Sequence, residues 1–474
     1  MVFSSYAFIF VFFPIAFAVY WLAARLLGGT AAKIWLVVAS LCFYAQGNAS
    51  YLPLLVSTTL FNYGAVRLLG RQRRGSAAAR LILTAAIVES LALLLYFKYA
   101  GFFVDNINLL LGASLPHRSG VLPLGISFYT FIIVSCVVDT YRGKSEPSSF
   151  LDFSVFVTFF PHLIVGPISR YGDVVPQFVQ EDSRFELNSR NIALGILLFS
   201  IGCAQKLIIA DPLIAHARQF YGLAGGGSFF EAWGGVISCA FAYYFDFSGY
   251  IDMALGSALF FNIKLPFNFD SPYKARDFAD FWRRWNITVS EFFYEHIFRN
   301  IFHFGDRLGK LFLATMATFL VSGLWHGAGW HYVLWGAANG LLVCVAFIMT
   351  LKRKSLPYPL SWALTFFLML LTRVLFDSSS VTQAVSVYRT ILDVRPLFAD
   401  PAGFLAQGLF YLRANALVAF LTLVGAGICF LAPNSREISE RFQMKWYHAV
   451  FAGALLVASL FCMGRVSDFL YMQF

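Results

Sequence analysis

The segment 311–351 contains no Asp, Glu, Lys or Arg and is long enough for two membrane-spanning helices, since each needs ~20 apolar residues. Its middle, residues 322–331, reads SGLWHGAGWH. The three glycines weaken a helix there, because glycine loses more backbone freedom on folding than other residues. We therefore expect two helices with a break inside residues 323–329 and a protonatable side chain, His326, beside that break.

His326 has two interpretations on these residues alone. An ionisable side chain inside a membrane segment is costly and is a functional candidate by default, but a neutral, hydrogen-bonded packing histidine fits equally well. His331 lies next to Tyr332 and near Trp335, which is typical of an interfacial anchor. The two histidines are five positions apart rather than four, so they do not share the helix face that a two-histidine metal site needs. We expect no metal site.

The composition predicts an all-α polytopic membrane protein. Hydrophobic residues make up 59% of the 474 residues and charged residues 13%, against about 25% charged in soluble proteins. We expect about eleven transmembrane helices, at ~20 residues each, with re-entrant and interfacial helices, in one membrane domain spanning 1–474. The net charge of +10 indicates cytoplasmic loops and not a nucleic-acid partner. The basic loop after residue 66 predicts a periplasmic N-terminus.

Several segments differ from plain spans. Residues 82–97 are expected to cross the membrane, with Lys98 and the amphipathic segment 101–112 at the outer interface. Residues 150–165 are interrupted by proline and glycine, which predicts a re-entrant element surrounded by protein. Residues 358–376 read as a simple span, and 377–408 as the largest external loop.

Two carboxylates stand six positions apart within the apolar sequence 243–252. We expect Asp246 to play a structural role, as a cap at the start of a helix. The role of Asp252 stays open.

The sequence from 273 to 300 interleaves aromatic and charged residues, which predicts one amphipathic helix at the membrane. Asp280 stands three and four positions before Arg283 and Arg284, a spacing that favours ion pairs on a helix. Asn286 falls in the middle of this helix, where asparagine has low propensity.

Six separated motifs together resemble one family, the bacterial membrane-bound O-acyltransferases, and are closest to its alginate O-acetyltransferase branch. The motifs are 122–128 (LPLGISF), 138–143 (VDTYRG), 159–168 (FFPHLIVGPI), 244–254 (YFDFSGYIDMA), 280–285 (DFWRRW) and 323–328 (GLWHGA). The resemblance implies a core over residues 5–345, C-terminal transmembrane helices over 346–474, and tilted helices around a central funnel. It also implies that His326 is the invariant catalytic histidine. One position departs from the branch, which has His where this chain has Asn286.

Acyl transfer to a hydroxyl needs a base for the alcohol proton and a hydrogen-bond donor for the oxyanion. We expect His326 to supply the base and Asn286 the donor. The candidate supporting or donor-binding residues are Trp282, Arg283, Trp285, Trp325 and Asp246.

The expected donor is a cytoplasmic acyl thioester, either acetyl-CoA or an acyl carrier, and no permanently bound cofactor is expected. The expected partners are membrane lipids, a polysaccharide acceptor and, by family analogy, a periplasmic or membrane-tethered SGNH-type acetyltransferase. The resemblance implies the inner membrane of a bacterium.

Two other functions fit parts of the sequence. A secondary transporter could use Asp246, Asp252 and His326 as a proton relay, since broken helices and buried ionisable groups are typical of transporters too. A non-catalytic scaffold for a polysaccharide machine would need none of these side chains for chemistry.

Overall fold

The computed structural model describes residues 2–116, 121–145, 149–179, 186–223 and 227–465. Across these residues the chain is helical, as predicted, and its one bridge of strand type pairs Phe269 with Trp285. The helices of the first half are α1 (Phe13–Leu27), α2 (Gly29–Asn48), α3 (Leu52–Gly70), α4 (Ala77–Leu111), α5 (Ile126–Tyr141), α6 (Phe150–Thr158), α7 (Phe160–Leu163), α8 (Tyr171–Val174), α9 (Pro176–Val179), α10 (Ser189–Ala204), α11 (Asp211–Gly222) and α12 (Phe229–Leu259).

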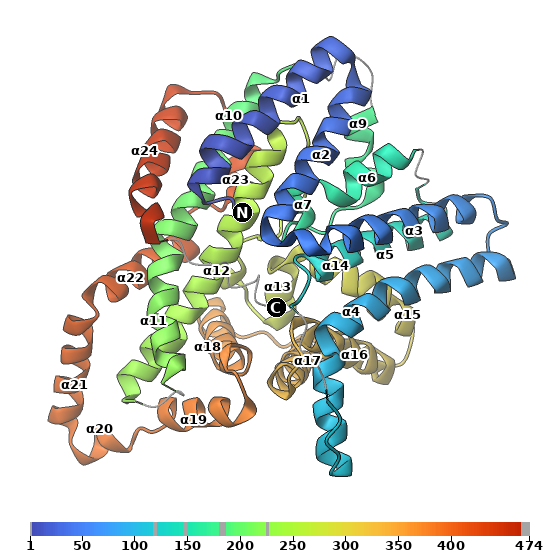
Figure 1. The fold of residues 1–474 in the computed structure, drawn as a ribbon. Coiled ribbons are helices and arrows are strands. Elements are labelled where there is room, and N and C mark those ends of the chain that lie inside the picture. The colour runs from blue at the N-terminus through green and yellow to red at the C-terminus, as the bar shows by residue number, and fades with distance from the viewer. Residues whose placement is uncertain (1, 117–120, 146–148, 180–185, 224–226, 466–474) are drawn as a thin grey trace.

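The second half is helical as well. Its helices are α13 (Phe278–Arg284), α14 (Ile287–Phe293), α15 (Arg299–Ile301), α16 (Leu308–His326), α17 (Trp330–Leu351), α18 (Tyr358–Asp377), α19 (Val381–Ile391), α20 (Arg395–Ala399), α21 (Pro401–Ala414), α22 (Ala416–Leu431), α23 (Ser435–Arg441) and α24 (Trp446–Cys462). The short helices α13 and α14 lie near the centre of the molecule, beside the α16–α17 pair (Figure 1).

The polytopic membrane fold is confirmed. In the described part of the chain, seven helical stretches are long and apolar enough to cross a membrane, or eight if the bent pair α21 and α22 is one span. The expectation of about eleven took each apolar run of ~20 residues as one span. The 42-residue stretch combines α2 and α3 and has the length of two such runs, while the apolar helices α5 and α24, with 16 and 17 residues, are shorter than the seven.

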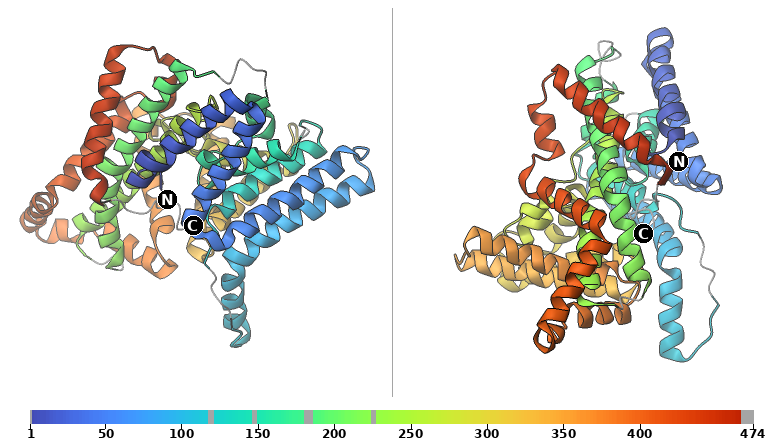
Figure 2. Two further views of the ribbon diagram at one scale, coloured as in Figure 1. Left: turned by 45° about the horizontal axis from the view of Figure 1, so that its top comes forward. Right: turned by 90° about the vertical axis from the view of Figure 1, so that its left-hand side faces the viewer.

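Helix α12 is the buried axis of the fold, and α10 and α11 run beside it (Figures 1 and 2). It begins at a capping box formed by Ser228 and Glu231, and every residue from 238 to 259 is buried. Asp246 lies inside this continuous helix. The expectation that Asp246 caps a helix start is therefore wrong, because the helix runs through it without a break.

Glycines let α10 and α12 approach closely. A methyl group on Gly202 would lie 2.4 Å from the carbonyl oxygen of Gly249, and one on Gly195 would lie 2.8 Å from that of Gly256. Small residues at such crossings allow backbones to pack directly, as is common between membrane helices.

Asp246 is one of two carboxylates that neutralise a fully buried lysine. Lys206 lies in the π-helical segment η4 (Gln205–Ala210), and its Nζ atom lies 2.7 Å from Asp246 Oδ1 and 2.8 Å from Asp211 Oδ1. A buried charge is tolerated only when it is paired in this way. The ion pairs therefore join η4 and the start of α11 to α12.

Helix α4 is continuous from Ala77 to Leu111, with 35 residues, and it bends, so that its C-terminal part runs in a different direction from its N-terminal part (Figure 1). The expected span at 82–97 and the amphipathic segment at 101–112 are parts of this one helix. One uninterrupted helix exceeds the ~30 Å of hydrocarbon, and its C-terminal end projects from the rest of the molecule (Figure 1).

Two other expected segments had different outcomes. The re-entrant element at 150–165 is present as the short buried helices α6 and α7, which are separated at Phe159. The expected loop at 377–408 is wrong, because its residues form α19, α20 and most of α21. The start of α19 is capped by the Ser380 side chain, which accepts from the Gln383 amide, and such a cap favours helix over loop.

The predicted break inside 323–329 is confirmed. Helix α16 ends at His326, residues 327–329 turn the chain, and α17 begins at Trp330. The two helices touch through glycines, since a methyl group on Gly323 would lie 2.3 Å from the Tyr332 carbonyl oxygen and one on Gly336 would lie 2.4 Å from that of Phe319. This contact fixes the end of α16 against the start of α17.

The buried lysine gives a prediction about stability. Lys206→Met should lower the melting temperature of the detergent-solubilised protein more than Asp246→Asn does, because it leaves two buried carboxylates without their cation. Removing one partner of a buried pair costs about 3–5 kcal/mol, whereas Asp246→Asn keeps the pair between Lys206 and Asp211. A larger loss of stability in Asp246→Asn would contradict this account.

The hairpin contact gives a second prediction. Gly323→Ala should lower both melting temperature and activity, because its methyl group meets backbone that cannot move without separating the helices. Gly309→Ala in the same helix is the matched control, since nothing lies within 4 Å of that position and alanine favours a helix over glycine by about 1 kcal/mol. Equal effects of the two substitutions would mean that the contact does not matter.

Candidate active site

His326 is the last residue of α16, and it is only 5% exposed. Its imidazole is surrounded by aromatic rings, whose centroids lie 4.7 Å away for Trp325, 5.0 Å for Trp335 and 5.0 Å for Phe376. All three rings meet it edge to face, a favourable arrangement for aromatic systems. The side chain is thus confined in orientation by its neighbours.

Asn286 does not lie in the middle of a helix, so the expectation of one helix over 273–300 is wrong. The segment is divided into α13 and α14, and Asn286 is the residue before α14, with a left-handed backbone at φ 45°. Asparagine and histidine are both enriched in this conformation, while most residues avoid it. The antiparallel bridge between Trp285 and Phe269 supports the break from outside the segment.

A chain of hydrogen bonds fixes the orientation of the Asn286 side chain. The Ile168 amide donates to Thr288 Oγ1 (3.0 Å), so the Thr288 hydroxyl donates to Asn268 Oδ1 (2.9 Å). The Asn268 NH₂ group then donates to Asn286 Oδ1 (3.1 Å). Because the oxygen of the Asn286 amide accepts this hydrogen bond, its orientation is set, and its NH₂ group is the end that can donate.

The larger cavity at this site has a volume of about 530 Å³ and lies between α14 and the α16–α17 pair. His326 and Asn286 both line it, from α16 and from the start of α14. Three further residues that the sequence analysis singled out line it too: Trp282, Arg283 and Trp285. Its volume falls within the range of small-molecule sites.

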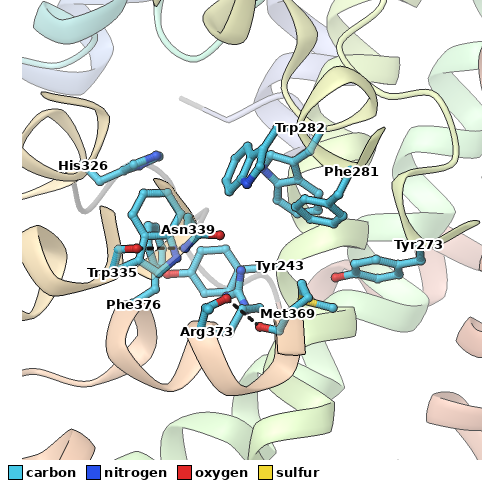
Figure 3. Close-up of a pocket in the computed structure, with 12 residues that line it drawn as sticks. Tyr243, Tyr273, Phe281, Trp282, His326, Trp335, Asn339, Met369, Arg373 and Phe376 are labelled. Atoms are coloured by element: carbon cyan, nitrogen blue, oxygen red, sulfur yellow. Dashed lines mark hydrogen bonds between the residues drawn. The ribbon is translucent and has the colours of Figure 1, made fainter. Parts of the chain in front are cut away.

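A smaller cavity of about 20 Å³ lies on another side of His326. Figure 3 shows His326 and Trp282 at one end of this space and Arg373 with Tyr243 below them. The volume is enough for about one water molecule. His326, Trp282 and Trp285 line both cavities, so they separate the two spaces.

The sequence analysis missed Arg373, which lines the smaller cavity. Its guanidinium lies 2.5 Å from Asp377 Oδ1 and 4.1 Å from the centre of the Tyr243 ring. The signal was present, because a charged residue inside an otherwise apolar span is a functional candidate, yet 358–376 was interpreted as a simple span. Asn268 was missed as well, and nothing local distinguishes it.

Two of the proposed supporting residues lie elsewhere. Trp325 lines neither cavity, and its ring stacks on Phe131 at 5.3 Å. Asp246 is held in the ion pair with Lys206 described above. The structure therefore brings together His326, Asn286, Trp282, Arg283 and Trp285, and it gives Trp325 and Asp246 packing and ion-pair contacts.

Arg170, Arg283 and Arg284 differ in their contacts, and of these three Arg283 lines the larger cavity. Arg284 is bound to Asp280 at 2.9 Å, and Arg170 to Glu295 at 3.0 Å. Burial raises the pKa of Glu295, but the hydrogen bond and charge of Arg170 lower it further, so that the pKa lies below its ordinary value and the carboxylate stays paired. Arg283 lies 3.8 Å from Asp280 with a side chain that is 71% exposed, which makes it the arginine best placed to meet an anion.

An open hollow of about 360 Å³ lies on the far side of the α16–α17 break. Its walls include Ala328 and Gly329 of the turn, with Trp330, Asp105 and Asn106. His326 is the last residue of α16 that lines the larger cavity, and Ala328, two positions later, lines the hollow. Within the described residues, no group of three or more His, Cys, Asp or Glu side chains could hold a metal ion.

Comparisons with known proteins agree with the motifs. The family model of the membrane-bound O-acyltransferases matches residues 88–381. The chain is 36% identical to a peptidoglycan O-acetyltransferase of Helicobacter pylori, over all of this chain and 98% of that protein. It is 34% identical to a probable alginate O-acetylase of Pseudomonas aeruginosa, over 82% of this chain and 75% of that protein.

A more distant match is a teichoic acid D-alanyltransferase of Streptococcus thermophilus, 28% identical over 49% of this chain and 59% of that protein. The family match extends beyond residue 345 and takes in α18, which carries Arg373. The resemblance seen in the motifs is confirmed. The chain belongs to the membrane-bound O-acyltransferase family and is an acyltransferase.

Proposed function

We propose that this enzyme moves an acetyl group from a thioester to a hydroxyl group of an exported polysaccharide or of a partner protein that relays the acyl group. His326 is the general base and Asn286 the oxyanion donor. The observation that carries the proposal is that both side chains line one cavity, with the donor end of Asn286 fixed by the chain of hydrogen bonds from Ile168.

In the proposed reaction, neutral His326 takes the proton of the acceptor hydroxyl while its oxygen attacks the thioester carbonyl. The carbonyl oxygen becomes an oxyanion, to which the Asn286 NH₂ group donates a hydrogen bond. The carbon–sulfur bond then breaks, and the leaving thiolate receives the proton from His326. The products are an oxygen ester and a free thiol, and the enzyme returns to its starting state.

The residues that line the larger cavity favour a donor whose thioester is carried on a pantetheine arm. Thr315, Thr318, Ser322 and His326 all line this cavity from α16, at spacings that place them on one helix face. The distance from Thr315 to His326 along the helix is about 16 Å at 1.5 Å per residue. The two threonine hydroxyls donate to backbone carbonyls one turn earlier, so their lone pairs remain for the amide N–H groups of such an arm.

Arg283, at the rim of the same cavity, favours a donor that carries a phosphate group. Arg283 is exposed there and loosely paired, and a guanidinium binds phosphate well. Coenzyme A and an acyl carrier both present phosphate next to pantetheine, so the rim suits either of them.

On the acceptor side, we propose that the hydroxyl approaches through the hollow beyond the break. The basic loop after α3 supports a cytoplasmic donor side and a periplasmic N-terminus, in a bacterial inner membrane. The printed functions of the relatives, O-acetylation of peptidoglycan and of alginate, support a polysaccharide as the final acceptor. By family analogy, an SGNH-type acetyltransferase completes the transfer, with residues 5–345 as the core and 346–474 as additional helices.

The contacts of the two aspartates favour acyl transfer over a proton-relaying transporter. Asp246 is bound to Lys206 at 2.7 Å, and Asp252 accepts from Gln205 at 3.2 Å and from Ser435 at 2.5 Å. Neither aspartate lines the cavities next to His326. A relay from these carboxylates to the histidine therefore has no support among the described residues.

The role of His326 predicts that His326→Ala abolishes transfer, since general-base catalysis contributes about 10²–10⁴ in rate. Release of free thiol and acetylation of acceptor would be measured in proteoliposomes supplied with acetyl thioester. His303→Ala, at a histidine whose side chain is 72% exposed, is the control and should keep normal activity. Normal acetylation by His326→Ala would favour the scaffold, and uptake of an intact solute without thioester would favour the transporter.

The donor role of Asn286 predicts a specific order among three variants. Asn286→His should stay active, because histidine tolerates the left-handed backbone and can accept from Asn268 with one ring nitrogen while donating with the other. Asn286→Asp and Asn286→Ala should lose about 10²–10³ in kcat, since neither donates to an oxyanion. The aspartate variant keeps the shape and the acceptor oxygen of asparagine, so activity near that of the unmodified enzyme would show that the N–H donor is not needed.

A further inference from the structure

Lys98 carries an amine into an apolar part of α4, within the sequence 91–103, where every neighbour is uncharged. A lysine near the centre of a membrane helix costs about 2.5–3.5 kcal/mol, so such a residue is expected to have a partner. No carboxylate lies within ion-pair distance of Lys98 among the described residues. Its partner is a backbone group instead, at the end of α16.

The last four carbonyl groups of a helix have no partner within that helix, and in hydrocarbon an unsatisfied carbonyl costs several kcal/mol. At the end of α16, two of these groups are bound by consecutive residues of α4. Lys98 Nζ donates to the Trp325 carbonyl oxygen at 2.5 Å, and Tyr99 Oη donates to that of Leu324 at 2.7 Å. The Lys98 amine also lies 5.8 Å from the centre of the Trp325 ring.

We propose that Lys98 is a positioning residue for acyl transfer, which holds the end of α16 so that the His326 imidazole faces Asn286 across the larger cavity. This inference rests on the proposed function. Lys98 lines neither cavity next to His326, so it acts through the backbone and does not touch the reacting atoms.

The hydrogen bond from Lys98 should restrain His326 more than the neighbouring hydrogen bond from Tyr99 does, because of where each one holds α16. Trp325 directly precedes His326, and the backbone after His326 is extended at Gly327, so no further helical turn restrains the histidine from the C-terminal side. The Lys98 amine is also a hydrogen-bond donor at a helix C-terminus, where the carbonyl groups have no partner within the helix. The hydrogen bond from Tyr99 reaches the Leu324 carbonyl, one residue further from the histidine.

Misplacing a catalytic group by about 1 Å can cost 10²-fold in rate. Lys98→Met, which keeps the length of the side chain and removes the donor, should therefore lower kcat about 10- to 100-fold and leave KM for the acetyl thioester within about twofold, because the donor cavity is intact. Lys98→Arg should recover most of kcat, since a guanidinium can donate to the same carbonyl. Tyr99→Phe is the matched control, and its kcat should fall by less than about threefold.

The experiment uses the full-length enzyme in proteoliposomes, with acetyl thioester consumption as the readout and the melting temperature as a check of folding. If Lys98→Met cannot be recovered folded, Lys98→Gln carries the same prediction, because its shorter side chain does not reach the carbonyl. A normal kcat in the lysine variants, or an equal loss in Tyr99→Phe, would overturn the proposal. If the lysine variants are normal while His326→Ala is inactive, only the positioning role fails. If His326→Ala is active too, the proposed function fails with it.

Discussion

Helix α16 ends inside an apolar protein, where its last carbonyl groups need hydrogen-bond partners, and the surrounding structure supplies them. Helix α16 stops at His326, so its last carbonyl groups need partners and its polar last residue needs a confined place. The contact between Gly323 and Tyr332 presses α17 against that end, and Lys98 and Tyr99 bind two of the exposed carbonyls. The rings around His326 then restrict the imidazole to a position between two cavities.

The buried charges of this chain fall into two groups with different surroundings. Lys206 joins helices through its ion pairs with Asp211 and Asp246, and none of these three residues lines a cavity described above. Arg373 with Asp377 lies instead beside the small cavity that His326 lines. The ion pairs of Lys206 stabilise the fold. Arg373, a cation at the wall of a cavity, also contributes to the electrostatic field inside that cavity.

The local sequence predicted a structural element correctly where neighbouring residues determine that element. The break after His326 follows from glycines within seven residues, and the helices on either side follow from a continuous apolar sequence. Where the cause lies far along the chain, the sequence misled. Aspartate is a common helix cap, but Asp246 lies inside α12, and its partner Lys206 is forty residues earlier in the chain.

The same limit explains the errors around Asn286 and Arg373. Helix propensity over 273–300 supports one helix, and only the bridge to Phe269 and the hydrogen bond from Asn268 break it at Asn286. The resemblance to the family placed His326 and Asn286 among the candidates, yet it gave no reason for the donor end of Asn286 to be the one left available. That reason lies in Ile168 and Thr288, which are 120 residues apart.

The most direct test of this account is a structure of the enzyme with a pantetheine analogue in which a methylene group separates the sulfur from the acetyl carbonyl, so that transfer cannot occur. The account predicts that the arm lies along Thr315, Thr318 and Ser322 in the larger cavity, with the ketone oxygen about 2.7–3.1 Å from Asn286 Nδ2 and next to the His326 imidazole. An analogue bound outside this cavity, or one whose carbonyl turns toward the apolar wall formed by Val343 and Phe347, would contradict it.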